Sequence, residues 1–246
     1  MEFGSKEYVD SMILGSLMGD GHINAPRGNN INPTIGFTAE SVKEVKYLKL
    51  KYDLVNKFYK TGKIRKGHFK TNRFDISSKE KELTQKMIDM TRLENNKRKY
   101  PDIKDFNEVA LLYWYIDDGS LSLGIQKRPN GRKSTISRSI SIALKSYKTE
   151  DTLEFMELIN KKFNLNFKPK FYKGKTEGIR IKKLDDMVNF LELMNPLLKD
   201  IPKEQYYKFC MGYYANRNPK EGYYKYNKCN FHENLYCNCR DKQIKL

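Results

Sequence analysis

Two apolar segments of this sequence, ILGSLMGDG at residues 13–21 and LLYWYIDDG at residues 111–119, both end with an aspartate directly before a glycine. The aspartates, Asp20 and Asp118, lie 98 residues apart (118 minus 20). Helical spacing of apolar residues predicts a helix in each segment. An aspartate at a helix C-terminus faces the negative end of the helix dipole, which costs roughly 0.3–1 kcal/mol. Because this costly ending occurs twice, we expect two related halves in which the acids have a function.

The elements predicted around the two segments follow the same order. In the first half we predict a helix at 6–18 stopped by Gly21, strands on either side of the loop 25–33, a helix at 41–59, a basic hairpin at 63–76 and a helix at 78–93 capped by Ser77 or Ser78. In the second half we predict a helix at 109–118, a long hairpin at 120–144, a capped helix at 149–164, a basic hairpin at 167–181 and a helix at 184–198. The chain is therefore predicted to be α+β, with αββαββα halves at 6–104 and 105–215 and a basic C-terminal tail at 216–246.

The predicted hairpins have one polar face. In STISRSISIAL, the serines 137, 139 and 141 alternate with Ile140, Ile142 and Leu144, so one face is buried and the other open. Two-stranded ribbons fit the DNA major groove, where basic and amide side chains contact bases. The alternative is an ordinary solvated sheet face. The residues expected to contact DNA from these faces and their loops are Arg27, Asn30, Arg65, Lys66, Lys70, Arg73, Gln126, Arg128, Arg132, Lys133, Arg138, Lys170, Lys173 and Arg180.

The charge balance favours a polyanionic partner. The 246 residues include 47 Lys and Arg against 30 Asp and Glu, a formal net charge of +17. Such an excess repels itself and attracts nucleic acid, although a Lys- and Asn-rich composition from an AT-rich genome is the alternative explanation. The longest apolar run, 109–116, is far below the ~20 residues that span a bilayer. No signal peptide is visible and cysteines are few, so we expect an intracellular, reducing compartment and no membrane association.

The glycines of the first segment indicate how the two acids meet. Gly15 and Gly19 lie on one helix face, where small residues let a partner helix approach closely. If the partner is the second segment's helix, Asp20 and Asp118 come together and repel each other unless a divalent cation lies between them. We therefore predict a Mg²⁺ or Mn²⁺ site with Asp20, Asp118, Gly19 and Asp117 as ligands. Metal ions held in this way cleave phosphodiesters, which favours a metal-dependent nuclease.

The two segments resemble the paired motifs of single-chain LAGLIDADG homing endonucleases. The resemblance places the catalytic acids at Asp20 and Asp118, while Tyr113 departs from the motif, which usually has a small residue there. NNKRKYP at residues 95–101 is similar to the segment that supplies a basic active-site residue, with Arg98 the best match and Lys97 next. QYYKF at residues 205–209 is similar to a late segment that supplies a lysine, here Lys208. Ordinary phosphate contact is the alternative role for these cations.

The resemblance implies motif helices packed at a central interface and antiparallel sheets that form a DNA-binding saddle. It also implies an intron-encoded monomer that cleaves both strands of a long, asymmetric DNA target. Two alternatives stay open. One is an intron RNA maturase that uses the same basic surfaces, and the other is a DNA-binding regulator without activity, which the intact acids disfavour.

Two further features stand apart from these motifs. His22 follows Asp20 by two residues, but no second histidine motif surrounds it, so we interpret it as a strand residue near the site. In the tail, the spacing C-x2-H-x4-C-x-C provides candidate ligands for tetrahedral Zn²⁺. These four residues are Cys229, His232, Cys237 and Cys239. The alternative is a basic tail with free thiols.

Overall fold

The computed structural model describes residues 1–26, 32–39, 42–66, 71–93, 97–126, 135–144 and 147–209. The N-terminal half contains α1 Lys6–Met18, β1 His22–Asn24, β2 Thr34–Ala39, α2 Val42–Val55, β3 Arg65–Lys66, β4 Asn72–Asp75 and α3 Lys81–Thr91. The C-terminal half contains α4 Glu108–Asp118, β5 Gly119–Gln126, β6 Thr135–Ala143, α5 Thr149–Phe163, β7 Lys168–Tyr172, β8 Lys175–Ile181 and α6 Leu184–Met194, followed by the 3-10 helices η2 Asn195–Asp200 and η3 Lys203–Lys208. The predicted α+β class and the repeated αββαββα order are confirmed.

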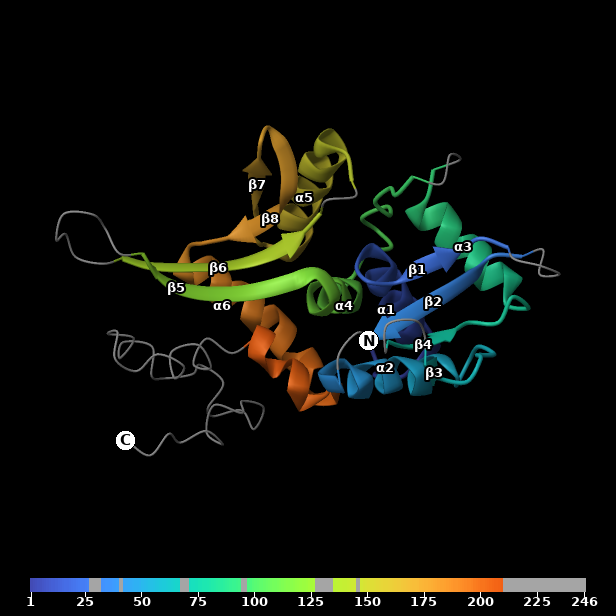
Figure 1. Cartoon of the computed structure of the whole chain (residues 1–246). Helices are drawn as coiled ribbons and strands as arrows, with labels where there is room; N and C mark the ends of the chain where they lie inside the picture. Colours follow the sequence, from blue (N-terminus) through green and yellow to red (C-terminus); the bar gives the residue numbers. More distant parts are fainter. Residues whose placement is uncertain are drawn as a thin grey trace, which may run out of the picture.

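Each half forms one four-stranded antiparallel sheet. The strand orders are β1-β2-β4-β3 and β5-β6-β8-β7, so corresponding strands occupy corresponding places in the two sheets. Figure 1 shows α1 and α4 between the two sheets. This equivalence supports the prediction of two pseudo-symmetric halves. Among the described residues, no helix combines the length and the apolarity that crossing a membrane requires.

Helix starts are set by local caps, and one differs from the prediction. Ser5, just outside the predicted first half, caps α1 by accepting a hydrogen bond from the Tyr8 N–H at 3.2 Å. Asn107 caps α4 in the same way. The predicted cap of α3 at Ser77 or Ser78 is wrong, because α3 begins after Glu80. A turn in which the Glu80 N–H donates to the Ser77 carbonyl at 3.0 Å occupies this stretch instead.

The end of α1 also differs from the prediction. The helix stops at Gly19, whose N–H donates to the carbonyls of Gly15 and Ser16, and not at Gly21. Gly21 closes the turn that follows, because its N–H donates to the Ser16 carbonyl at 2.7 Å. Asp20 therefore lies in this tight turn, directly beyond the last helical carbonyls.

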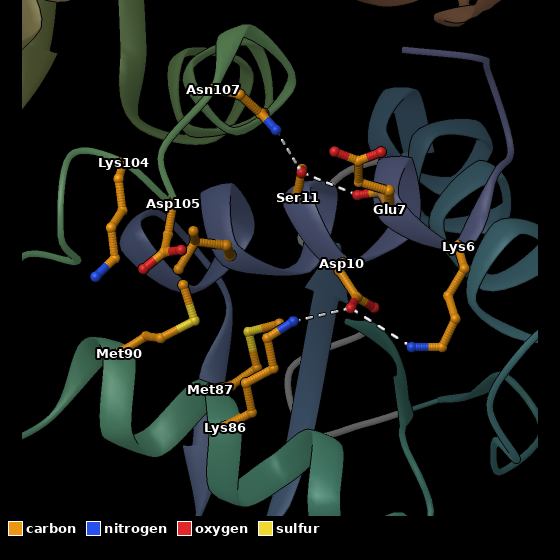
Figure 2. A pocket seen from close by; sticks show the side chains of 11 residues that line it. Lys6, Glu7, Asp10, Ser11, Lys86, Met87, Met90, Lys104, Asp105 and Asn107 are labelled. Atoms are coloured by element: carbon orange, nitrogen blue, oxygen red, sulfur yellow. Dashed lines mark hydrogen bonds and ion pairs between the residues drawn. The ribbon is translucent and has the colours of Figure 1, made fainter.

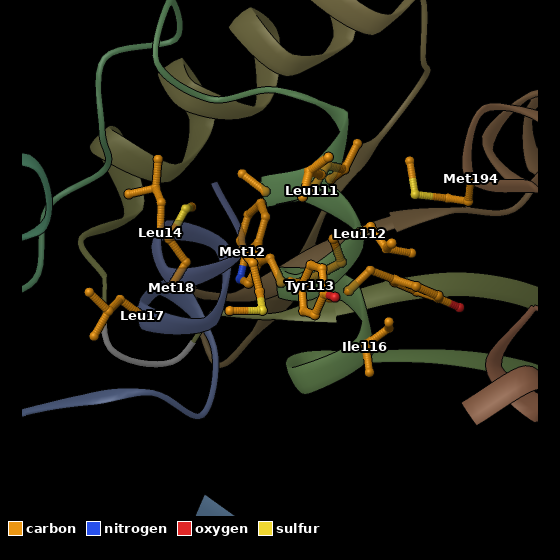
Figure 3. Packing of buried hydrophobic residues seen from close by; sticks show 14 of the residues in the cluster. Met12, Leu14, Leu17, Met18, Leu111, Leu112, Tyr113, Ile116 and Met194 are labelled. Carbon is orange, nitrogen blue, oxygen red and sulfur yellow. The ribbon is translucent and has the colours of Figure 1, made fainter. Parts of the chain in front are cut away.

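The centre of the molecule is the contact between α1 and α4, as predicted. A Cβ atom at Gly15 would lie 2.2 Å from the Ala110 carbonyl oxygen, and one at Gly19 would lie 2.5 Å from the Asp117 Cβ. These glycines therefore permit the close approach of the two helices. Figure 3 shows apolar side chains of both helices, among them Met12 and Leu112, packed around this contact.

Tyr113, the departure from the motif, does not hold the helices apart. Its ring stacks on Tyr47 of α2 with centroids 5.9 Å apart and meets the Tyr8 ring edge-on at 6.1 Å. The two hydroxyls of Tyr8 and Tyr113 lie 3.3 Å apart. The large ring is thus accommodated in the core, where it is fully buried.

Strand register separates a buried face from an open face in each sheet. In the C-terminal sheet Ile140 pairs with Ile181 and Ile142 with Ile179, and all four are buried. Ser141, on the opposite face, pairs with Arg180. The alternation predicted for this strand is therefore confirmed.

Register corrects two predicted DNA contacts. Arg138 leaves β6 on the same face as the buried residues Ile140 and Ile142, so its predicted place on the open face is wrong. Lys66 pairs with Asn72, whereas its neighbour Arg65 pairs with Arg73. Because successive side chains alternate, Lys66 and Arg65 lie on opposite faces, and only Arg65 shares the face of Arg73.

Candidate active site and nucleic-acid interface

The two motif aspartates meet where α1 and α4 end. Asp20 is exposed in the turn after α1, and Asp118 is the half-buried last residue of α4. Loss of hydration and then the Asp117 carboxylate raise the pKa of Asp20 to about 6. Burial and then the Asp20 carboxylate raise the pKa of Asp118 to about 7. Both acids therefore resist ionisation in the protein alone, because burial and the neighbouring carboxylates outweigh the nearby cations.

Asp117 has a different environment. Both of its oxygens accept hydrogen bonds from the Lys51 ammonium at 2.9 Å, and the side chains of Lys51 and Asp117 are only 5% and 2% exposed. Lys51 also lies 4.3 Å from the centroid of the Tyr47 ring. The prediction that Asp117 is a metal ligand therefore does not fit the structure, because a buried ion pair occupies its oxygens. Lys51 was missed in the sequence, since nothing in α2 marks it as a partner of α4.

A cation lies on the end of each motif helix. Arg98 donates to the carbonyls of Met18 and Gly19 at the end of α1, at 3.2 and 3.4 Å. Lys208 donates to the Ile116 carbonyl near the end of α4. Burial lowers the pKa of Lys208, and the carboxylates of Asp117 and Asp20 oppose this effect. These cations offset the negative ends of the two helix dipoles directly beside the acids.

The structure favours Arg98 over Lys97 as the cation of the first half. Lys97 is exposed, whereas Arg98 is half-buried against α1. The Gly19 carbonyl, predicted as a metal ligand, accepts a hydrogen bond from Arg98 in this structure.

Two tyrosines that the sequence analysis did not single out hold the cations and the helix ends in place. Tyr115 donates to the Lys208 carbonyl at 2.8 Å, and the Tyr147 hydroxyl donates to the Met18 carbonyl at 3.5 Å.

The donor set suits an oxygen-preferring divalent cation. Among the described residues, no group of three or more His, Cys, Asp or Glu side chains is placed to hold a metal. Asp20 and Asp118 alone therefore supply carboxylates, and waters or phosphate oxygens would complete a Mg²⁺ shell. The convergence of two acids with raised pKa values fits such an ion, because its charge would relieve their repulsion.

His22 lies beside this site on β1. Burial and then the Arg73 guanidinium lower the pKa of His22, so the imidazole is neutral at pH 7. His22 pairs with Gly36 of β2 and is half-buried. It is a strand residue near the site, as we interpreted it, and register places it on the open face.

The remaining predicted DNA contacts fall into two groups. Arg65, Arg73, Lys170 and Arg180 lie on the open faces by register, and Lys173 lies in the turn between β7 and β8. The others lie outside the described residues, as do the candidate zinc ligands Cys229, His232, Cys237 and Cys239. These untested contacts are Arg27, Asn30, Lys70, Arg128, Arg132, Lys133 and the side chain of Gln126.

A hollow of about 470 Å³ is separate from the carboxylates. It is lined by the first turns of α1, by α3 and by the segment before α4, whereas Asp20 follows the last turn of α1. Figure 2 shows Lys6 and Lys86 directed at Asp10 in this hollow, with nitrogen–oxygen distances of 3.6 and 3.1 Å. Asp10, one of three acids that line the hollow, is therefore already paired with two lysines.

Comparison with protein families decides the identity. A model described as the LAGLIDADG DNA endonuclease family matches residues 10–187. The chain belongs to this family. Comparison with curated proteins gives no match.

Solved structures of LAGLIDADG proteins share the fold. The homing endonuclease I-WcaI bound to its DNA recognition sequence aligns with a TM-score of 0.60 and 23% identity, over 83% of this chain and 86% of that one. I-SmaMI bound to uncleaved DNA with calcium ions aligns with a TM-score of 0.55 and 12% identity, over 85% and 87%. The LAGLIDADG homing endonuclease I-LtrWI bound to target DNA aligns with a TM-score of 0.53 and 12% identity, over 80% and 84%. This chain thus shares the fold across both halves.

Proposed function

We propose that this LAGLIDADG protein is a monomeric, metal-dependent endonuclease that cleaves both strands of a long, asymmetric DNA target. The observation that carries the proposal is the meeting of Asp20 and Asp118 at the ends of α1 and α4, with one cation on each helix end. Both acids have raised pKa values, because burial and neighbouring carboxylates outweigh the cations beside them. A divalent cation would neutralise the two carboxylates, and the negative charge of a phosphodiester would balance the two cations.

Asp20 and Asp118 would hold Mg²⁺ or Mn²⁺ between the two halves. When bound, the ion supplies Lewis-acid stabilisation of the attacking and leaving oxygens of a phosphodiester. Arg98 and Lys208 lie where they can stabilise negative charge on the phosphate as it develops. The α1–α4 contact sets the separation of the two acids, because the absence of a Cβ atom at Gly15 and Gly19 permits the close approach of the two helices.

An asymmetric target follows from differences between the two open faces. In the N-terminal sheet, His22 lies two residues after Asp20, and its successive cross-strand partners are Gly36 and Asp75. In the C-terminal sheet, Ser120 lies two residues after Asp118, and its successive cross-strand partners are Ser141 and Arg180. Corresponding places in the two sheets thus carry different chemistry, so the two half-sites should differ in sequence. The DNA-bound neighbours with the same fold support double-stranded DNA as the ligand. An intron RNA is the alternative ligand, and competition of structured RNA with target DNA tests it.

The test combines selection of cleaved sites from randomised duplex DNA with neutral variants of the acids. The wild type in Mg²⁺ should yield one asymmetric site cut on both strands. Asp20→Asn and Asp118→Asn should each abolish double-strand cleavage, leaving at most nicking of one strand, while binding to the selected site persists. Asp185→Asn, which removes a 77% exposed carboxylate of α6, is the matched control and should cleave normally. Wild-type cleavage by the variant that lacks both motif acids would overturn the mechanism.

A further inference from the structure

An acidic residue occupies the open face of the N-terminal sheet, where cations are expected. Asp75 of β4 pairs with Gly36 of β2, and the equivalent pair in the C-terminal sheet is Arg180 with Ser141. Asp75 therefore stands where the other half carries an arginine. A carboxylate on a DNA-facing surface repels phosphate, so its presence on a chain with a net charge of +17 needs a specific reason.

The contacts of Asp75 supply this reason. One carboxylate oxygen accepts from the Arg73 guanidinium at 2.7 Å and from the Asn24 amide at 3.2 Å. The other oxygen accepts from the Arg65 guanidinium at 2.6 Å. Arg65 and Arg73 are direct cross-strand partners on β3 and β4. One acid thus fixes two neighbouring arginines, and an amide from a third strand fixes the acid.

The backbone is shaped to hold this cluster. A Cβ atom at Gly36 would lie 2.4 Å from the His22 Nε2, 2.8 Å from an Asp75 oxygen and 2.9 Å from the Asn24 amide nitrogen. Only glycine leaves room for the three side chains to converge over β2. Asp75, Asn24 and both arginines also line a surface groove of about 600 Å³.

We propose that Asp75 is a specificity-determining residue, which holds Arg65 and Arg73 in the groove as a rigid pair that recognises guanine in the target DNA. The inference rests on the proposed function and adds to it the base class read by the N-terminal half. Asp75 acts through the arginines and is a positioning residue, whereas the arginines contact the bases.

The chemistry favours guanine. Arginine donates two parallel hydrogen bonds to guanine N7 and O6, and the planar fork must be held in orientation to discriminate between bases. The Asp75 oxygens already accept three hydrogen bonds, which leaves the outward N–H groups of the arginines as the donors of this cluster. The Arg73 Nε is buried, so the outward donors of this side chain are the terminal nitrogens of its guanidinium group. A free arginine would instead reach the nearest phosphate and add affinity without specificity.

The test is selection of bound sequences from randomised duplex DNA in Ca²⁺, followed by affinity measurements on the selected site and on unrelated DNA. The wild type should select guanines at the positions that the N-terminal half contacts. Asp75→Asn should lose this preference, by between about fivefold and 150-fold for each guanine. The same variant should bind unrelated DNA more tightly than the wild type, because a negative charge is removed. In Asp75→Asn, the preference for guanine should therefore fall while the affinity for unrelated DNA rises.

Two further variants complete the test. Glu177→Gln, which removes a carboxylate that contacts Lys170 at 3.5 Å instead of an arginine, is the matched control and should keep the selected sequence. Arg73→Lys keeps the charge but not the fork, so it should also lose the guanine preference. Retention of the guanines by Asp75→Asn, or equal weakening on every sequence, would overturn the inference. Failure of the wild type to select any sequence would instead overturn the proposed function.

Discussion

At the scale of single residues, the position of the two motif acids at the ends of α1 and α4 raises the pKa of both. Asp118 is half-buried at the end of α4 and faces the Asp20 carboxylate, which together raise its pKa to about 7. The pKa of Asp20 is raised to about 6 by loss of hydration and then by the Asp117 carboxylate. Functional sites often contain carboxylates whose ionisation costs stability, because the ligand and not the fold supplies the compensating charge.

This tuning predicts a pH-dependent effect of Asp118→Asn in the absence of metal. The folded pKa of Asp118 lies above its unfolded value, so the wild type loses stability as pH rises from about 4 to about 7, and the loss persists above pH 7. Asp118→Asn removes this pH-dependent loss of stability, so the variant should have a higher melting temperature than the wild type at pH 8 but not at pH 4. Thermal melts with a chelator measure this.

Addition of Mg²⁺ provides the complementary measurement. At pH 8 the ion should raise the melting temperature of the wild type more than that of Asp118→Asn, because binding to the native state stabilises it. Asp185→Asn should behave like the wild type in both melts. Equal melting temperatures for Asp118→Asn and the wild type at pH 8 would contradict the role assigned to the carboxylate.

At the scale of elements, a buried ion pair joins the two halves beside the site. Lys51 comes from α2 of the N-terminal half and Asp117 from α4 of the C-terminal half. The Asp117 side chain also lies against Gly19 of α1. This pair links three helices and holds both oxygens of the Asp117 carboxylate on Lys51.

Removal of one partner should therefore be more harmful than removal of both. Lys51→Met leaves the Asp117 charge buried and should lower the free energy of unfolding by about 3–5 kcal/mol. Adding Asp117→Asn to Lys51→Met should recover most of this loss, since no uncompensated charge remains. Urea denaturation of the wild type, both single variants and the double variant measures the coupling. Losses that simply add would show that the two side chains do not act as a pair.

At the scale of the whole molecule, the repeated halves place two basic open faces beside one central site. The charge excess of +17 is spread over both halves and the C-terminal tail, so binding should depend on many phosphate contacts. The rigid centre, where α1 and α4 meet, holds the acids, while the sheets provide affinity and recognition (Figure 1).

DNA binding should consequently weaken steeply with salt. If about 8 phosphates are neutralised, the logarithm of the association constant should fall with the logarithm of salt concentration with a slope near −7. Lys170→Gln should reduce the magnitude of this slope by about 1, if this lysine of the open face contacts a phosphate. Fluorescence anisotropy titrations between about 50 and 200 mM salt measure both slopes. A slope near zero would exclude the two sheets as the DNA-binding surface.

The sequence by itself determined the features that depend on near neighbours. Apolar periodicity located the helices, and the alternation of Ser141 with Ile140 and Ile142 identified the open face of its strand. The two Asp-Gly endings located the acids, since a repeated local cost indicates function.

Only the tertiary structure decided which distant groups meet. The contacts of Lys51 with Asp117, of Arg98 with Met18 and of Lys208 with Ile116 span 66, 80 and 92 residues. Asp117 was predicted as a metal ligand because a carboxylate beside Asp118 looks available in sequence, and its partner comes from another helix. Local patterns record which face a residue occupies and not which residue of another element lies opposite. The convergence of Asp20 with Asp118, the cations beside them and the arginines held by Asp75 therefore follow from how the chain packs.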